Sequence, residues 1–513
     1  MAIDTSFATT SVRPPRVLSK SKLLSFRQCP KKLWLQIHRS ELEETSSATE
    51  ADFAVGYQVG EVARKLFDPK GAGVDIDPKA EGVAAAIAKT RSLLSGSAPI
   101  FEAGFEANGA RAFADVLLPI TKRGKRAWRM VEVKSATAVK DYHREDAAIQ
   151  ATVARAAGLA LDSITVAYID KTWVYPGGGD YRGLLLEEDV SKDAFGAAAT
   201  VGTWVKEALA VVRLAEEPRR TTGAHCRSPY VCGFSDYCRS KEPQAEYPVT
   251  WLPRIQRKAL KAAIARDAII DLRHVPDDLL NAEQLRVKTH TLSGQAYFGA
   301  KQAANALTAH ELPAYFLDFE TISFAVPIWK GTRPYQQLPF QFSVHRLTRA
   351  AKLEADSFLD LSGNDPRRAL AESLIRACGT EGPVFVYSSF EAKRIHDLAK
   401  QYRTLRSALL ALCARLVDLL PIAQSHYYHP SQHGSWSIKK VLPAVAPDLD
   451  YGALPGVKDG GMAMAAYVDA IGPETTPERR EQIHQELVAY CGLDTLTMVR
   501  VWEFLSGNPR AAA

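Results

Sequence analysis

The run Ala-Tyr-Phe-Leu-Asp-Phe-Glu-Thr (residues 314–321) decides the expected architecture of the second half of the chain. It has the composition of a buried strand that ends in two acids. Alternate side chains of an extended strand share one face, so Asp318 and Glu320 are expected to point the same way. An earlier run, Val-Glu-Val-Lys (131–134), places a glutamate and a lysine on one face in the same manner. The chain therefore predicts two separate acidic sites, each at the heart of its own α/β core.

Bulk composition is that of a globular protein with more than one domain. The chain has 513 residues, of which 46% are hydrophobic and 24% charged, and a net charge of +6. A length of this kind exceeds one ordinary core. The mild positive charge permits binding to a polyanion without requiring it. The sequence contains no apolar stretch of membrane-spanning length and no signal-peptide pattern at Met-Ala-Ile-Asp-Thr-Ser, which predicts a cytoplasmic protein with no membrane partner.

The alternation of apolar residues predicts a mixed α/β core in the first half. Residues 19–67 are expected to be helical. Residues 99–134 alternate as strands around a Lys/Arg/Gly turn at 122–126. A helix over 143–157 and a strand over 163–169 complete that core.

A second α/β pattern begins near residue 314. The predicted strands are 314–319, 339–347 and 384–387. The predicted helices are 367–378, 391–401 and 477–505. Between the two cores, residues 252–284 are helical and basic. They are interpreted as a connector, with a solvated helix face as the alternative. The expected organisation is a flexible N-terminus (1–18), a first domain (19–245), a helical connector (246–311), a second domain (312–506) and a disordered tail (507–513).

The first acidic constellation joins Asp115 on one strand to Glu132 and Lys134 on the next. Two carboxylates placed in this way suit Mg²⁺ or Mn²⁺, which prefer oxygen ligands. Alternating charge on a strand often marks a solvent face, but the apolar flanks here favour a central strand, where unpaired charges are costly. Gln150 is expected to face the same site from the following helix. That helix also carries Tyr142, His143 and Asp146.

Four of the seven cysteines are expected to form one cofactor site. Cys226, Cys232 and Cys238 follow one another at regular intervals, and Cys29 stands alone near the N-terminus. Zinc sites of four cysteines usually show paired C-x2-4-C spacing. One isolated cysteine with a distant triplet fits an iron–sulfur cluster at least as well, and ordinary buried thiols remain the plain alternative. The remaining cysteines are not expected to take part: Cys378, Cys413 and Cys491.

The order of these residues resembles that of the RecB-like PD-(D/E)XK nucleases with a four-cysteine iron–sulfur cluster, such as the CRISPR adaptation exonucleases and the AddB-type helicase–nucleases. The resemblance covers about residues 19–240. It implies a restriction-endonuclease-like core with a 4Fe-4S cluster, or zinc in its place. It also implies that Asp115 and Glu132 bind metal, that Lys134 serves catalysis and that Gln150 supports the site.

Two positions depart from that family pattern. Residues 56–60 (Gly-Tyr-Gln-Val-Gly) lack the histidine that many members carry on an early helix, and Gln150 is not followed by the usual tyrosine. Glu102 or Glu106 is the candidate for a further ligand.

The second constellation adds three residues to Asp318 and Glu320. Glu391 follows a short apolar run at the start of a helix. Tyr490 and Asp494 are four residues apart in a helical stretch and so share one face. Four acids can hold two metal ions about 3.5–4 Å apart, an arrangement that clamps the attacking and leaving oxygens of a phosphodiester.

This set resembles the tyrosine subtype of the DEDD exonucleases in the ribonuclease H-like (DnaQ-like) superfamily, over about residues 312–506. The resemblance implies that Asp318, Glu320, Glu391 and Asp494 bind metal and that Tyr490 orients the attacking water. Glu391 stands where the family usually has aspartate. The whole layout is similar to a bacterial family in which the two nuclease types are fused.

A loop over 426–440 mixes aromatic residues, histidines and lysines, among them Lys439 and Lys440. It could stack on bases and contact phosphates, or it could bury its aromatic side chains. Asp418, with apolar neighbours, is a candidate supporting acid.

The expected function is a metal-dependent nuclease that cleaves DNA, or RNA, in repair or in defence against foreign DNA. The sequence contains no G-x4-G-K-[ST] motif, so unwinding is expected from a partner helicase. Two other functions stay open: a nucleic-acid-binding scaffold with reduced catalysis, and a redox-sensing regulator that uses the cluster.

Overall fold

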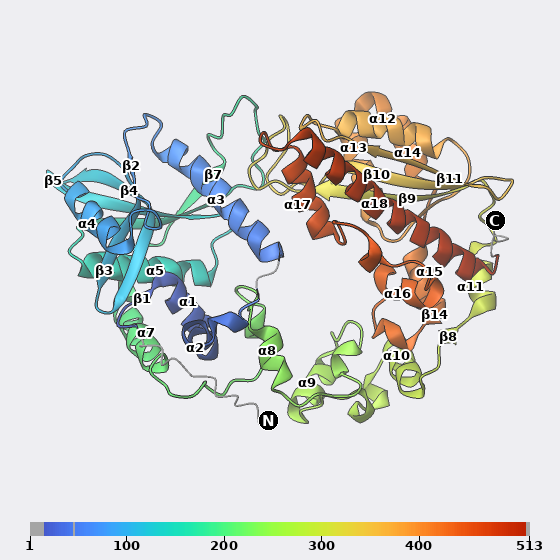
Figure 1. The fold of residues 1–513 in the computed structure, drawn as a ribbon, viewed down its shortest axis with the longest axis horizontal. Helices are drawn as coiled ribbons and strands as arrows, with labels where there is room; N and C mark the ends of the chain where they lie inside the picture. The colour runs from blue at the N-terminus through green and yellow to red at the C-terminus, as the bar shows by residue number, and fades with distance from the viewer. Residues whose placement is uncertain (1–14, 45–46, 509–513) are drawn as a thin grey trace, which may run out of the picture. The chain divides into compact units, whose positions relative to one another are not determined.

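The computed structural model describes residues 15–44 and 47–508, and the chain is mixed α/β (Figure 1). It divides into two compact units. The first ends at Glu242 and also takes in the segment Phe324–Tyr335, while the second begins at Pro243. Residues 1–14 of the N-terminus expected to be flexible, and residues 509–513 of the expected tail, lie outside the described residues. Leu18, also expected in that flexible segment, is instead buried in a strand that pairs with the first sheet.

The first unit is built on a seven-stranded mixed sheet. Its strands follow the order β2-β3-β4-β5-β6-β7, with β1 paired to β4. The pairs β3/β4, β4/β5 and β6/β7 are antiparallel, whereas β5/β6 is parallel. The strands are β1 (Leu18–Ser19), β2 (Val74–Asp75), β3 (Ile100–Ala107), β4 (Ala110–Lys122), β5 (Lys125–Lys134), β6 (Leu161–Ile169) and β7 (Leu185–Asp189).

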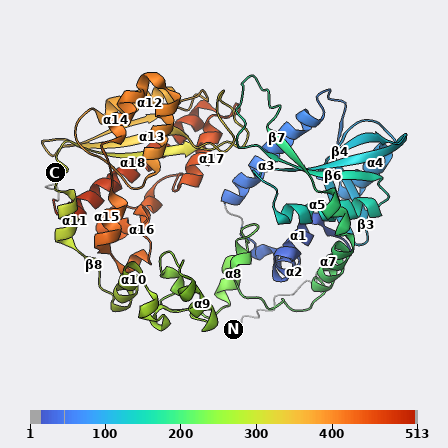
Figure 2. The ribbon, with the colours of Figure 1, turned by 180° about the vertical axis from the view of Figure 1, so that it is seen from behind.

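Helices cover both faces of this sheet (Figures 1 and 2). Met130 of β5 packs with residues of α5 and α7, while Val131 and Val133 face the opposite side, toward Phe67 of α3. Residues 19–67, expected to be helical, form α1, α2 and α3 with breaks between them. The helices of this unit are α1 (Lys20–Gln28), α2 (Pro30–His38), α3 (Ser47–Phe67), α4 (Val83–Leu93), α5 (Asp141–Ala156), α6 (Ser191–Gly196), α7 (Ala198–Val211) and α8 (Ser235–Ser240).

The hairpin between β4 and β5 closes through two residues. Arg123 has φ +50° and Gly124 has φ +75°. A two-residue loop with two positive φ values matches the right-handed twist of its strands. It sets the register that places Glu132 and Lys134 on the face of Met130.

The second unit contains a five-stranded sheet in the order β11-β10-β9-β12-β13. β9, β10 and β11 are antiparallel neighbours, and β12 and β13 run parallel to β9. Its strands are β9 (Ala314–Ile322), β10 (Leu338–Leu347), β11 (Leu353–Leu359), β12 (Val384–Val386) and β13 (Leu416–Asp418), and a separate pair is formed by β8 (Tyr297–Phe298) and β14 (Tyr427–Tyr428).

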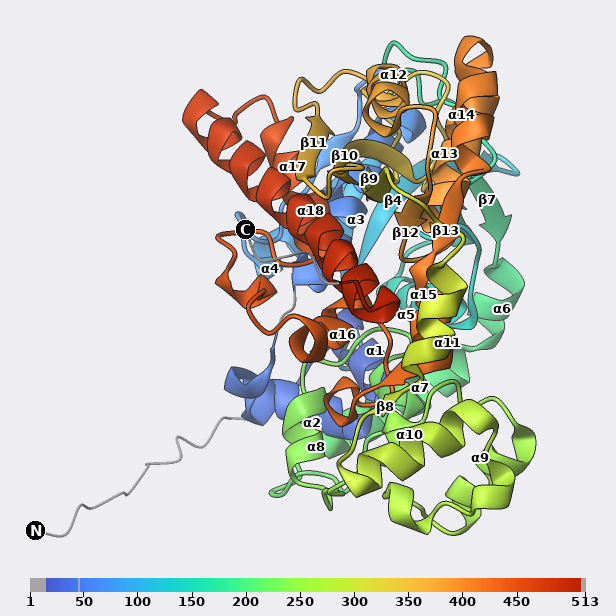
Figure 3. The same ribbon diagram turned by 90° about the vertical axis from the view of Figure 1, so that its right-hand side faces the viewer.

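The two faces of β9 bury different side chains. Phe316 packs on α18 through Trp502, whereas Leu317 and Phe319 pack toward α12, α13 and α14. Figure 3 shows α18 on one side of this sheet and α12 on the other. The helices of this unit are α9 (Lys258–Arg266), α10 (Ala282–Ser293), α11 (Ala300–Leu307), α12 (Arg367–Cys378), α13 (Phe390–Gln401), α14 (Arg406–Cys413), α15 (Leu419–His426), α16 (Ile438–Val445), α17 (Gly460–Ala470) and α18 (Pro477–Ser506).

The segment Phe324–Tyr335 leaves the second sheet after β9 and belongs to the first unit. Ala325 and Val326 pack in an apolar cluster with Val59 of α3 and Ile169 of β6. The Tyr335 hydroxyl donates a hydrogen bond to the Ser135 carbonyl. Sequence patterns gave no sign of this excursion.

The stretch expected to be a separate connector (246–311) belongs to the second unit. Leu260 of α9 is buried with Leu252 and Leu272 in a small cluster of its own, so this stretch is more than a solvated helix face. None of the helices in the described part of the chain is long and apolar enough to cross a membrane.

Candidate active sites

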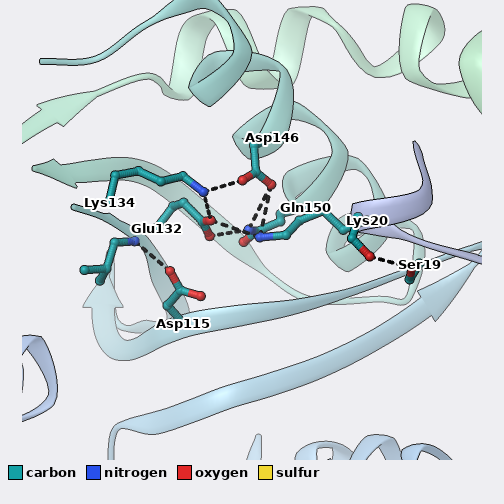
Figure 4. A network of polar contacts seen from close by, with 9 residues as sticks. Ser19, Lys20, Asp115, Glu132, Lys134, Asp146 and Gln150 are labelled. Atoms are coloured by element: carbon teal, nitrogen blue, oxygen red, sulfur yellow. Dashed lines mark hydrogen bonds and ion pairs between the residues drawn. The ribbon is translucent and has the colours of Figure 1, made fainter. Parts of the chain in front are cut away.

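The first site lies where β5 faces α5. Glu132 and Lys134 share the face of β5 that α5 covers, and the side chains of Asp146 and Gln150 reach them from one face of that helix (Figure 4). Lys134 Nζ lies 2.6 Å from Glu132 Oε1 and 2.5 Å from Asp146 Oδ2. Gln150 donates to the other Glu132 oxygen. The structure thus brings together three residues of the predicted site and adds Asp146, which the sequence singled out only as a neighbour.

Lys20, at the start of α1, also enters this site. Its ammonium lies 2.9 Å from Glu132 Oε1 and 3.0 Å from Asp146 Oδ1 (Figure 4). Ser19 caps α1 by accepting a hydrogen bond from the Lys22 amide, which fixes where the helix starts. Two buried carboxylates therefore face two ammonium groups.

The Asp115 side chain hydrogen-bonds to the backbone of the neighbouring strand. Its Oδ2 accepts a hydrogen bond of 2.7 Å from the Val133 amide. The backbone pairing of β4 and β5 ends at Val116 and Val131. Beyond that pair, the Asp115 side chain is the acceptor for a β5 amide. Asp115 thus binds backbone through one carboxylate oxygen, and its charge helps to raise the pKa of Glu132. Metal binding by Asp115 and Glu132 together stays a prediction.

Of the two candidates for a further ligand, Glu102 lies closer to the site than Glu106. Glu102 has φ +53°, lies opposite Asp115 at the one position that the β3/β4 pairing skips, and contacts Arg64 at 3.6 Å. Glu106 is exposed and lies 3.6 Å from Arg111.

The charges of the first site partly offset one another. Burial, together with Asp115 and Asp146, raises the pKa of Glu132 to about 7. Although burial opposes it, the two lysines hold the pKa of Asp146 below its usual value. Burial would also lower the pKa of Lys20, but Asp146 and Glu132 raise it above that of a free lysine. The two lysines thus offset much of the negative charge of Asp115, Glu132 and Asp146.

The four cysteines of the predicted cofactor site line one small cavity. Cys29 sits between α1 and α2, where Pro30 starts the second helix. The other three come from the loop that leads into α8 and from α8 itself. Lys31, Lys32 and Arg220 line the same cavity. Its thiols are free, and no three of them in the described chain lie within 4.8 Å of one another.

The second site is formed by β9 and α18. Asp318 and Glu320 lie on the strand face that carries Phe316, which packs against α18. Tyr490 and Asp494 are buried on α18, one helical turn apart. Oxygen atoms of Asp318 and Glu320 and the sulfur of Cys491 all lie within 4.8 Å of one another.

One family profile covers the strand of this site. Residues 315–437 match the family described as Domain of unknown function (DUF2779). No curated protein matches the chain. The matched part runs from β9 to the loop before α16, so it includes Asp318, Glu320 and Glu391 and stops short of α18.

Glu391 lies near the edge of the second site, on the side of Asp418. It occupies the first turn of α13, and Ser388 Oγ donates to its carboxylate at 3.2 Å. Asp418 ends β13 and caps α15 by accepting from the Leu420 amide at 2.9 Å. Because β9, β12 and β13 are parallel, their carboxyl ends meet at one edge of the sheet, which gathers Asp318, Glu391 and Asp418.

Two tyrosines and a lysine complete the second site. Tyr451 Oη donates to Asp494 Oδ1 at 2.6 Å, and Lys439 Nζ donates to Tyr490 Oη at 3.0 Å. Lys439 belongs to the loop expected to stack on bases or to bury its aromatics. Tyr427, Tyr428 and Trp436 of that loop are buried in the core next to α18.

Burial and mutual repulsion disfavour the charged forms of these acids. Burial, with Asp494 and Glu320 close by, raises the pKa of Asp318 well above its usual value. Burial, then Asp494, raises the pKa of Glu320 to about 8. Burial raises the pKa of Glu391 to about 7. A bound cation would stabilise the charged forms of these acids, as expected of a metal-binding site.

Sequence reasoning missed Lys20, Tyr451 and Cys491 as members of these sites. Lys20 lies in a polar run (Ser-Lys-Ser-Lys) that carries no periodic signal. Tyr451 is an isolated aromatic in a short turn. Cys491 could have been found, because it directly follows Tyr490 on α18.

Proposed function

We propose that this protein is a metal-dependent nuclease that hydrolyses phosphodiester bonds of DNA, with the second site as its main catalytic centre. One observation carries the proposal: one face of β9 and one turn of α18 bring Asp318, Glu320 and Asp494 together with Tyr490. Glu320 and Asp494 are buried and Asp318 is half-buried, and none of the three has a basic partner at bonding distance in the described part of the chain. Such a set of acids would be costly in a merely structural role. Their geometry supports a ribonuclease H-like exonuclease of the tyrosine subtype.

The donor set of the second site suits Mg²⁺ or Mn²⁺, since it is made of carboxylate oxygens. Asp318, Glu320 and Asp494 would hold the metal, with Glu391 at the edge. Such ions lower the pKa of bound water and stabilise charge on the phosphate. Burial and the surrounding acids raise the pKa of Tyr490, so this side chain would stay protonated and act as a hydrogen-bond donor that orients the water. The Cys491 thiol also has a raised pKa because it is buried, which makes it a poor ligand for these ions.

The first site supports a RecB-like PD-(D/E)XK assignment through Glu132, Lys134 and Gln150. Its two lysines offset much of the negative charge of the acids, and Asp115 is engaged with backbone. This observation favours a second candidate role for the first unit, namely a nucleic-acid-binding scaffold with reduced catalysis.

The cysteine cavity would hold an iron–sulfur cluster or zinc. Cys29, Cys226, Cys232 and Cys238 line it together with cationic side chains. Four thiolates bound to metal carry negative charge, which these cations would offset; one isolated cysteine with a distant triplet favours the 4Fe-4S cluster over zinc.

The test is an end-labelled degradation assay on single- and double-stranded DNA and RNA, with Mn²⁺ or Mg²⁺. We expect DNA shortening that Asp318→Ala abolishes. Metal-dependent binding without any cleavage would favour the scaffold. A role in DNA repair or in defence, in the cytoplasm and with a partner helicase, is the setting that this activity would fit.

A further inference from the structure

Lys439 is hydrogen-bonded to the tyrosine of the second site. It lies at the start of α16, and its ammonium donates hydrogen bonds to Tyr490 Oη at 3.0 Å and to the Lys458 carbonyl at 2.9 Å. A lysine ammonium has three N–H donors and no acceptor. These two bonds therefore use two of the three donors and fix the end of the side chain.

Two aromatic rings hold the same ammonium in place. Lys439 Nζ lies 4.7 Å from the ring centroid of Tyr490 and 4.8 Å from that of Tyr451. Cations are attracted to the faces of aromatic rings at such distances. Lys439 is thus tied to both tyrosines that border Asp494.

The direction of the Lys439–Tyr490 bond decides where the tyrosine proton points. Because lysine can only donate, Tyr490 Oη accepts, and its own hydrogen must point elsewhere. Asp494 lies on the same face of α18, one turn away. The Tyr490 side chain hydrogen-bonds to Asp494, so its proton points toward the acids.

We infer that Lys439 is a positioning residue for Tyr490: it holds the phenol so that the O–H faces the acids and the attacking water. The inference rests on the proposed nuclease function of this site and adds a residue to it. Neither the tyrosine-subtype pattern nor the family match, which ends at residue 437, includes Lys439.

A double-mutant cycle tests this role. The variants are Lys439→Gln, Tyr490→Phe and the two combined, with Lys400→Gln as the control because Lys400 is an exposed lysine on α13 of the same unit. We expect Lys439→Gln and Tyr490→Phe each to lower kcat about tenfold or more with little change in KM. The combined variant should be no slower than Tyr490→Phe alone, and Lys400→Gln should match the parent. Additive losses would mean that Lys439 does not act through Tyr490 and would overturn the inference.

Absence of cleavage would by itself contradict the nuclease proposal. A spectroscopic measurement still tests the inference about Lys439 in that case. The protein is labelled with ¹³Cζ-tyrosine, and the Tyr490 signal is assigned by its loss in Tyr490→Phe. Lys439→Gln should shift this signal, whereas Lys400→Gln should leave it unchanged. An unshifted Tyr490 signal in a Lys439→Gln protein with parental melting temperature would overturn the positioning role, whatever the activity.

Discussion

Lys20 Nζ lies 2.9 Å from Glu132 Oε1, although 112 positions separate the two residues in the sequence. The same ammonium contacts Asp146, so it lies between two carboxylates of the first site. An internal cation in this place competes directly with an external one.

Replacing Lys20 should therefore make the first site a better metal site. In Lys20→Met, Glu132 and Asp146 lose one of their two lysines, and we expect Mn²⁺ to bind them at least several-fold more tightly. Metal titration in an Asp318→Asn background, which weakens the second site, measures this. Lys22→Met is the control, because Lys22 lies on the same helix and contacts the Gln36 carbonyl instead of the acids. Unchanged affinity in Lys20→Met would show that Lys20 does not compete with the metal.

Tyr451 should strengthen metal binding at the second site. Its hydroxyl donates to Asp494, and a hydrogen bond to a charged group contributes roughly 1.5–3 kcal/mol. Tyr451→Phe should weaken Mn²⁺ binding about tenfold, measured by titration in a Glu132→Gln background. Tyr467→Phe removes another buried hydroxyl of this unit, one without a hydrogen-bond partner in the described structure, and should have no effect. Equal effects from the two variants would contradict the role given to Tyr451.

Stability without metal should fall as the pH rises from about 5 to 8. Burial and then Asp494 raise the pKa of Glu320 from 4.5 to about 8, so the folded chain holds a proton that the unfolded chain has already lost. The stabilising contribution is fully present below the ordinary pKa and is lost as the pH passes the raised one. Protons and metal compete for these acids, so Mn²⁺ should raise Tm more at pH 8 than at pH 6. In Glu320→Gln, the rise in Tm caused by Mn²⁺ should differ less between pH 6 and pH 8. If Mn²⁺ raises the Tm of the parent equally at both pH values, protons and metal do not compete for Glu320.

Cys232→Ala should remove the cofactor from the first unit. Anaerobically purified parent protein should be brown and carry iron and acid-labile sulfide, and the variant should lose both along with stability, because metal-binding energy is folding energy in such sites. Cys413→Ala, in the second unit and away from the cavity, is the control. Colourless parent protein with one zinc per chain would show that the four cysteines bind zinc and not an iron–sulfur cluster.

Asp318→Ala and Lys134→Ala should have separable effects, since the two sites share no residue. Loss of a metal ligand should cost roughly a thousandfold or more in rate, at about 1.4 kcal/mol per tenfold. Products from single- and double-stranded DNA, compared by gel for each variant, assign each activity to a site. If Lys134→Ala leaves every product and rate as in the parent, the first site has a structural or binding role only.

Local periodicity was enough to predict the elements that carry the acids. The expected strand 314–319 and helix 477–505 correspond to β9 and α18, and alternation on β9 correctly put Asp318 and Glu320 on one face. The helix over 367–378 has the bounds of α12. These predictions succeed because strand and helix periods are fixed by the backbone.

Long-range arrangements escaped prediction. No local pattern tells that Lys20 meets Glu132, that Asp115 bonds to the Val133 amide, or that residues 324–335 belong to the first unit. Each depends on which segments pair in three dimensions, and the free energy that decides this comes from packing far along the chain.

The excursion of Phe324–Tyr335 means that the polypeptide passes between the two units three times. Neither unit is a continuous stretch of the gene. A fragment ending at Glu242 would lack the partner that covers Val59 and Ile169, and a fragment beginning at Pro243 would carry Ala325 and Val326 uncovered. We therefore expect the two halves to be poorly soluble when produced alone and to recover when they are produced together.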